Sequence, residues 1–151
     1  GVNAVLPGYK YDYVFFTNRV RYDYAAEAYR DMFQQVKKIL LSNIKTKAAK
    51  DDYIVNFNRA IKRGWPHFDN AVICCLRLLD KLSVADVMIS GFDGFKTKYN
   101  ESYADTSLPT LNPDNDWDGL NREIKDIFKD FQNATRDTMH IEFVTKSTFE
   151  Q

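Results

Sequence analysis

The stretch 68–95 constrains the fold most, because it contains a helix, a short link and a strand in direct succession. Residues 68–82 predict a helix that is apolar on nearly every side, which is typical of a buried helix. Residues 83–84 form a short link, and the apolar run 86–90 follows as a strand. A buried helix that leads directly into such a strand is typical of parallel α/β folds.

The rest of the chain continues this alternation of strands and helices. Further strands are predicted at 1–6, 12–17, 39–41, 53–57 and 139–144, and further helices at 25–36 and 117–131. The strand at 53–57 alternates enough to lie near a sheet edge. We therefore expect an α/β fold, a Rossmann-like three-layer sandwich with a mostly parallel sheet flanked by helices.

The first two predicted strands have no helix between them. A parallel crossover normally takes a dozen residues or more, so strands 1–6 and 12–17 are either joined by a tight loop or run antiparallel. The chain also opens on a strand with no lead-in. We therefore expect residues 1–151 to be a single domain excised from a longer polypeptide, with an upstream strand absent.

The predicted helix at 68–82 carries few polar groups. Arg77, Asp80 and Lys81 lie at i, i+3 and i+4, which predicts one solvated stripe. Cys74 and Cys75 are adjacent and point in different directions from a helix, which argues against a disulfide between them. We expect two small core residues in a reduced, cytoplasmic protein.

Charge and hydropathy exclude several classes of partner. Lys plus Arg and Asp plus Glu both number 21, so neither a basic nucleic-acid surface nor a polybasic membrane patch is expected. No apolar run approaches the roughly 18 residues of a membrane helix. No signal peptide is visible.

The chain lacks the spacing patterns of the common catalytic and metal sites. His67 and His140 lie in different predicted elements, and neither has a neighbour at metal-ligand spacing. There is no GxSxG, GxGxxG or GxxxxGK[ST] motif. We expect no metal and no cofactor, and the sequence identifies no catalytic residue.

The sharpest candidate for a site is the strand end at Gly91, Asp93 and Gly94. In doubly wound sheets, ligands bind outside the carboxyl ends of the strands. Glycines let the backbone approach a ligand closely or adopt positive φ. The alternative is a plain turn in which the aspartate bonds its own backbone, and the pattern leaves both open.

Asparagines follow other predicted strands or begin a helix. Asn3 and Asn18 lie at strand ends, where an amide suits a nucleobase edge or a ribose hydroxyl. Asn70 opens the predicted helix, where backbone N–H groups and the helix dipole favour an anion. Turn or helix capping is the alternative for each, and for Asn70 both roles can hold.

The segment 95–116 is too long for a simple connector in a compact domain. Such segments are often functional lids or ordered excursions. Tyr99 and Tyr103 are candidates to close over a ligand, with aromatic surface cover as the alternative.

The segments 11–18, 69–71 and 90–95 resemble, in sequence and in order, the C-terminal region of bacterial aldolase-like proteins named for 4-hydroxy-2-oxovalerate aldolase. The resemblance runs over most of the chain. In that family a metal-dependent aldolase/lyase barrel forms the N-terminal part. The barrel and its metal ligands are not in this chain, so the resemblance implies an accessory domain without aldolase chemistry of its own.

The same landmarks are similar to the nucleotide-binding fold of bacterial sialyltransferases and motility-accessory glycosyltransferases. In that fold, strand ends and a helix start surround a cytidine nucleotide. The matching positions here are Asn3, Phe15-Phe16-Asn18 with Thr17 inserted, Asn70-Ala71 and Gly91-Phe92-Asp93. The family's catalytic histidine follows the Asp-bearing strand end, and residues 95–116 contain none. The resemblance implies a nucleotide-type pocket without that general base.

These inferences lead to one expected function and two alternatives. We expect an accessory C-terminal domain that binds a nucleotide, nucleotide-sugar or sugar-acid ligand, with Asp93 accepting from a hydroxyl and the helix start at Asn70 facing an anion. The alternatives are a glycosyltransferase active only with a missing upstream segment, and a structural or dimerisation module without a ligand. Expected partners are the small ligand and the N-terminal barrel, with a homodimer left open and with neither nucleic acid nor membrane.

Overall fold

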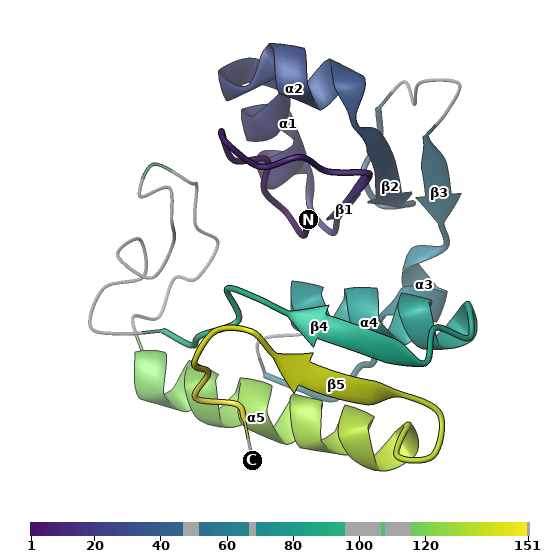
Figure 1. The fold of residues 1–151 in the computed structure, drawn as a ribbon, viewed down its shortest axis with the longest axis vertical. Coiled ribbons are helices and arrows are strands. Elements are labelled where there is room, and N and C mark those ends of the chain that lie inside the picture. The colour runs from purple at the N-terminus through teal and green to yellow at the C-terminus, as the bar shows by residue number, and fades with distance from the viewer. Residues whose placement is uncertain (47–51, 67–68, 96–106, 108–115, 151) are drawn as a thin grey trace. The chain divides into compact units, whose positions relative to one another are not determined.

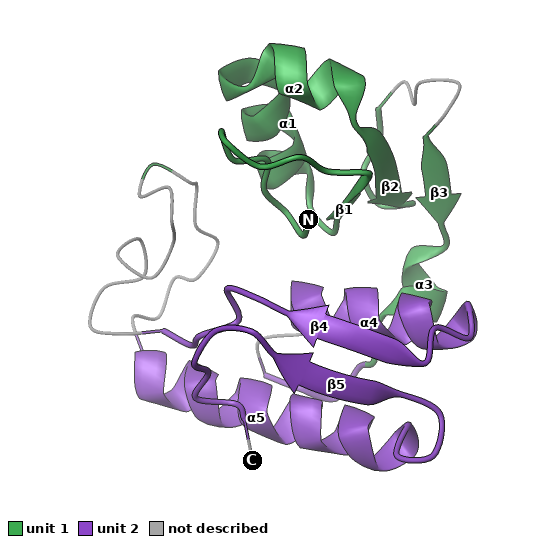
Figure 2. Cartoon of the chain, in the orientation of Figure 1, with its two compact units in different colours: residues 1–62, 107–109 green, residues 63–106, 110–151 purple. Residues whose placement is uncertain are grey.

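The chain divides into two compact units of α/β structure (Figures 1 and 2). The computed structural model describes residues 1–46, 52–66, 69–95, 107 and 116–150. Unit 1 comprises residues 1–62 and 107–109, and unit 2 comprises residues 63–106 and 110–151. Strands pair in parallel in both units, so the predicted α/β class is confirmed. The organisation as a single domain stays a prediction.

Unit 1 contains a sheet of three parallel strands in the order β1-β2-β3. The strands are β1 (Tyr13–Phe16), β2 (Lys37–Leu41) and β3 (Tyr53–Val55). The apolar strands β1 and β2 supply fully buried side chains, while β3 exposes Tyr53 and Ile54. The third strand therefore lies at the outside of this sheet, as its alternating pattern predicted.

Aromatic packing joins two helices of unit 1 to the sheet. The helices of this unit are α1 (Arg19–Ala28), α2 (Arg30–Gln35) and α3 (Phe57–Ala60). The ring of Phe16 on β1 lies 5.5 Å from that of Tyr22 and 6.0 Å from that of Phe33. Tyr22 and Phe33 meet edge to face at 5.0 Å. Each such pair adds about 0.5–1.5 kcal/mol beyond simple burial, so the trio stabilises α1 and α2 on the sheet.

The predicted strand at 1–6 is reduced to a single bridge between Val2 and Phe15. The N–H of Phe15 donates to the Gly1 carbonyl at 2.9 Å, and the N–H of Asn3 donates to the Phe15 carbonyl at 2.8 Å. The bridge is parallel, which decides between the two arrangements that the sequence left open. Asn3 has φ of 53°, in the left-handed region, so the backbone leaves the extended conformation directly after the bridge.

Two further boundaries in unit 1 differ from the prediction. The helix predicted at 25–36 begins at Arg19 and breaks at Tyr29 into α1 and α2. No glycine or proline marks this break, and the apolar spacing continues across it. The strand predicted at 53–57 ends at Val55, because the short helix α3 begins at Phe57.

The described part of unit 2 is built on a parallel strand pair with a helix in its crossover. Its elements are α4 (Ala71–Lys81), β4 (Asp86–Ile89), α5 (Trp117–Ala134) and β5 (His140–Phe143). Strands β4 and β5 pair in parallel, with Asp86 opposite His140. All four predicted elements are confirmed to within a few residues at their ends. The carboxyl ends of β4 and β5 point to the end of unit 2 at which α5 begins (Figure 1).

The core of unit 2 lies between the strand pair and its helices. Ile73 and Leu76 of α4 pack in one cluster with a stripe of buried residues on α5, which is Leu120, Ile124, Ile127, Phe128 and Phe131. The spacing of three and four residues in that stripe is the pattern that predicted an amphipathic helix. None of the described helices is long and apolar enough to cross a membrane.

The polar groups of α4 differ from the predicted solvated stripe. The Arg77 side chain is only 15% exposed and forms an ion pair with Asp69, whose side chain is 2% exposed. Arg77 reaches back past the start of the helix to this carboxylate. Of the three charged residues in the predicted stripe, only Lys81 is exposed. Cys74 and Cys75 are free thiols, and burial raises the pKa of both, that of Cys75 to about 11.

Candidate functional site

A glycine-bracketed turn, residues 91–94, follows strand β4. Gly91 has φ of +76° and Gly94 has φ of +94°, which is the left-handed region that glycine adopts without strain. A Cβ on Gly94 would collide with the Thr148 hydroxyl oxygen. The glycine at position 94 therefore permits both the turn and its close approach to the residues that follow β5.

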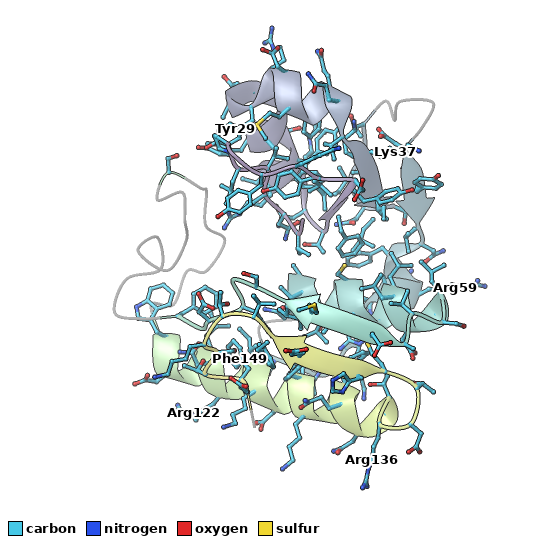
Figure 3. The ribbon with its side chains drawn as sticks, in the orientation of Figure 1. Tyr29, Lys37, Arg59, Arg122, Arg136 and Phe149 are labelled. Carbon is cyan, nitrogen blue, oxygen red and sulfur yellow. The ribbon has the colours of Figure 1, made fainter. Side chains whose placement is uncertain are left out.

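The segment 145–149, which we call the clasp, holds this turn. The Thr145 hydroxyl accepts from the Gly91 N–H and donates to Asp93 Oδ1, both at 2.9 Å. The Asp93 carbonyl accepts from the N–H of Thr148 at 3.2 Å and from its hydroxyl at 3.1 Å. Phe149 is 1% exposed and its ring lies 4.5 Å from that of Phe92, so the clasp is anchored in the core of unit 2 (Figure 3).

The Asp93 side chain is exposed, and its carboxylate has hydrogen-bonding capacity that is not used. Only its Oδ1 atom has a partner among the described residues, the Thr145 hydroxyl. Its carboxylate therefore bonds a distant side chain, and not the neighbouring backbone as in the plain turn that the sequence left open. A carboxylate only accepts hydrogen bonds, so the second oxygen is suited to a hydroxyl or ammonium hydrogen.

Asn121 fixes the chain as it leaves the turn. Its Oδ1 accepts from the Phe95 N–H at 2.9 Å, and its Nδ2 donates to the Phe95 carbonyl at 2.7 Å. The start of α5 is itself capped, because Asp116 accepts from the Gly119 N–H at 2.8 Å. The first turns of α5 therefore hold residue 95 in place beside Gly94.

Asn70 lies at the same end of unit 2 as Asp93. The link 82–85 is short, so α4 runs back along β4 and begins near the carboxyl end of that strand. Asn70 caps α4, since its Oδ1 accepts from the N–H of Val72 at 2.8 Å and of Ile73 at 3.3 Å. The predicted cap is confirmed, and an anion at this helix start stays a prediction.

In unit 1 the structure brings Asn3 and Asn18 together on either side of Thr17. Asn3 Nδ2 donates to the Thr17 hydroxyl, and Asn3 Oδ1 accepts from the Thr17 N–H, both at 2.8 Å. Asn18 caps α1 by accepting from the Arg21 N–H at 2.9 Å. Asn43, which follows β2, donates to the Thr17 carbonyl at 3.2 Å. These contacts give the asparagines a structural role, whereas a role in ligand binding stays a prediction.

Sequence reasoning missed the clasp and Asn121. The signal was available, because Thr145 to Thr148 follow the last predicted strand and strand ends of one sheet meet at one edge. Tyr99, Tyr103 and His67 lie outside the described residues. Among the residues that are described, no group of three or more His, Cys, Asp or Glu is arranged to hold a metal ion.

No protein-family model, no curated protein and no solved structure matches this chain. The resemblances to aldolase-like proteins and to sialyltransferases therefore stay predictions.

Proposed function

We propose that this chain is a ligand-binding α/β domain that holds the hydroxyl-bearing part of a nucleotide, nucleotide-sugar or sugar-acid ligand. The observation that supports this most directly is the Asp93 carboxylate. It is exposed at the end of a parallel strand, and one oxygen is fixed by Thr145 while the other has no partner among the described residues. A firmly held acceptor in this position suits a sugar hydroxyl.

The proposal extends to the surroundings of Asp93. Gly91 and Gly94 shape the turn, and Asn70 begins a helix at the same end of unit 2, where an anionic group of the ligand would be favoured. For unit 1, ligand binding by Asn3 and Asn18 stays a prediction of its own. We place the domain in a Rossmann-like three-layer sandwich, as the parallel β4–α5–β5 unit suggests.

The wider context is also proposed. The chain would be the accessory C-terminal domain of an aldolase-like polypeptide in the cytoplasm, where the free thiols of Cys74 and Cys75 are compatible with a reducing compartment. Sugar transfer by the parent polypeptide would instead favour the glycosyltransferase alternative. Binding of a nucleotide without turnover would count against that alternative.

A ligand screen with two aspartate variants tests the proposal. Thermal shift and titration calorimetry would use cytidine nucleotides, nucleotide sugars, N-acetylneuraminate and 2-oxo acids. Asp93→Ala is expected to weaken binding about tenfold, because it removes a hydrogen bond to a charged group. Asp86→Ala is the matched control, since Asp86 is an exposed carboxylate at the amino end of the same strand. If none of the ligands binds the unmodified chain, the proposal fails and the structural or dimerisation alternative is favoured.

A further inference from the structure

We infer that Thr145 is a positioning residue that orients the Asp93 carboxylate, and that the ligand group recognised there is a sugar hydroxyl and not a phosphate oxygen. This inference rests on the proposed function and specifies which part of the ligand Asp93 holds. It starts from the hydrogen-bond capacity of one hydroxyl group. Thr145 has one hydrogen to donate and two lone pairs with which to accept.

The Gly91 amide determines how the Thr145 hydroxyl is used. The Gly91 N–H can only donate, so the Thr145 oxygen accepts from it at 2.9 Å. The single hydroxyl hydrogen is then directed to Asp93 Oδ1, also at 2.9 Å. The two hydrogen bonds therefore run in one direction, from the Gly91 N–H through the Thr145 hydroxyl to Asp93 Oδ1. The other oxygen of this carboxylate has no hydrogen-bond partner among the described residues.

Thr145 is itself held by the core of unit 2. The Val144 N–H donates to the Ile89 carbonyl at 2.8 Å, and the Ser147 hydroxyl donates to the Phe92 carbonyl at 2.5 Å. Phe149 is buried against Phe92. Contacts on both sides thus fix the Thr145 backbone before any ligand arrives, which lowers the ordering cost of binding.

Two backbone donors that flank Asp93 are already used. The Gly91 N–H is bonded to Thr145, and the Phe95 N–H is bonded to Asn121 Oδ1 at 2.9 Å. A phosphate needs donors, whereas a ribose or hexose hydroxyl supplies one. The open acceptor on Asp93 therefore fits the sugar portion of a nucleotide or sugar ligand.

The first arm of the test needs no ligand. Scalar couplings would report the χ1 rotamers of Asp93 in the unmodified chain and in Thr145→Val, Thr145→Ser and Thr138→Val. Thr138→Val is the matched control, because it removes a threonine bond to another aspartate of unit 2, Asp80. We expect Asp93 to adopt one χ1 rotamer in the unmodified chain, in Thr145→Ser and in Thr138→Val. In Thr145→Val the Asp93 couplings should be averaged over several rotamers, and the Gly91 amide hydrogen should exchange faster with solvent. Unchanged couplings in Thr145→Val would overturn the positioning role whatever the ligand result.

The second arm compares cytidine 5′-monophosphate with its 2′,3′-dideoxy analogue by calorimetry. The unmodified chain should bind the hydroxylated nucleotide about tenfold more tightly, and Thr145→Val should lose most of this difference. Thr145→Ser and Thr138→Val should retain it. Equal binding of the two nucleotides would overturn hydroxyl recognition at Asp93. If neither nucleotide nor any ligand of the wider screen binds, the proposed function fails, and the couplings still decide the positioning role.

Discussion

The polar residues at the strand ends of the two units are used differently. In unit 1, Asn3, Asn18 and Asn43 all bond the backbone or side chain around the end of β1. In unit 2, Asp93 bonds Thr145 through one oxygen and leaves the other open among the described residues. An amide can satisfy backbone donors and acceptors together, whereas a carboxylate only accepts. Asn3 uses both ends of its amide on Thr17, whereas Asp93 keeps one carboxylate oxygen for a further partner.

Among its described residues, each unit also contains a largely buried ion pair. Lys38 in unit 1 donates to the carbonyls of Phe33 and Val36 at 3.2 and 3.0 Å and pairs with Asp52 at 3.3 Å. These acceptors match the three hydrogens of its ammonium group. Arg77 in unit 2 pairs with Asp69, but its Nη2 atom is buried with no partner among the described residues. The lysine site is the more completely satisfied of the two.

The largest expected effect concerns this lysine. Asp52→Ala would leave Lys38 buried without its counter-charge, at a cost of about 3–5 kcal/mol in the free energy of unfolding. Urea denaturation would measure the loss. Asp12→Ala, at an exposed position of the same unit, should change stability by less than about 0.5 kcal/mol. A cost for Asp52→Ala near that of the control would contradict the role of the pair.

Gly94→Ala should have the next largest effect, about 1–3 kcal/mol from backbone strain and further from contact with Thr148. Gly64→Ala is a matched control, because Gly64 has φ of +112° and a Cβ added there would meet nothing within 4 Å. Thermal unfolding of the two variants would separate strain from crowding. Equal losses of stability in the two variants would show that the clasp moves aside for the added Cβ at little cost. That result would weaken the proposed role of the clasp in holding Asp93.

Asn18→Ala should cost about 1 kcal/mol, because it removes the cap of α1. Asn18→Asp should keep most of that stability, since its carboxylate can accept from the same N–H. Chemical denaturation of both variants would test the structural role of the asparagines in unit 1. If Asn18→Ala kept its stability but bound ligand less well, Asn18 would be a ligand-binding residue and not a structural one. The contrast between the asparagines of unit 1 and Asp93 of unit 2 would then be wrong.

The smallest effect on stability is expected for Asp93→Ala. An exposed side chain with one hydrogen bond should contribute no more than about 0.5 kcal/mol. Its melting temperature should therefore stay close to that of the unmodified chain while ligand binding falls. A loss above about 1.5 kcal/mol would mean that Asp93 supports the fold, as the asparagines of unit 1 do.

Local sequence patterns predicted those parts of the fold that depend on neighbouring residues, and they missed parts that depend on tertiary packing. The cap at Asn70, the apolar face of α5 and the short link before β4 all follow from neighbouring residues. The break at Tyr29 carries no glycine or proline signal, so spacing alone missed it. Lys38 follows another lysine and gives no sign in the sequence that it is buried.

The candidate site could be predicted in part for a similar reason. A turn is predicted by the local sequence at Gly91, Asp93 and Gly94. Thr145, in contrast, contacts Asp93 although it lies 52 residues further along the chain. Such a contact depends on the parallel register of β4 and β5, which places their carboxyl ends side by side. The sequence indicates that residues after the two strands meet at one edge of the sheet, but it does not give the register that pairs Thr145 with Asp93.

The two thiols of α4 allow the opening of unit 2 to be timed separately from that of unit 1. Both cysteines of the chain lie on this helix, so unit 1 contains no thiol that an alkylating reagent could label. Burial raises the pKa of both thiols, which keeps the reactive thiolate scarce in the native state. Pulse labelling with iodoacetamide, followed by mass spectrometry, would therefore report how often this helix detaches from its core.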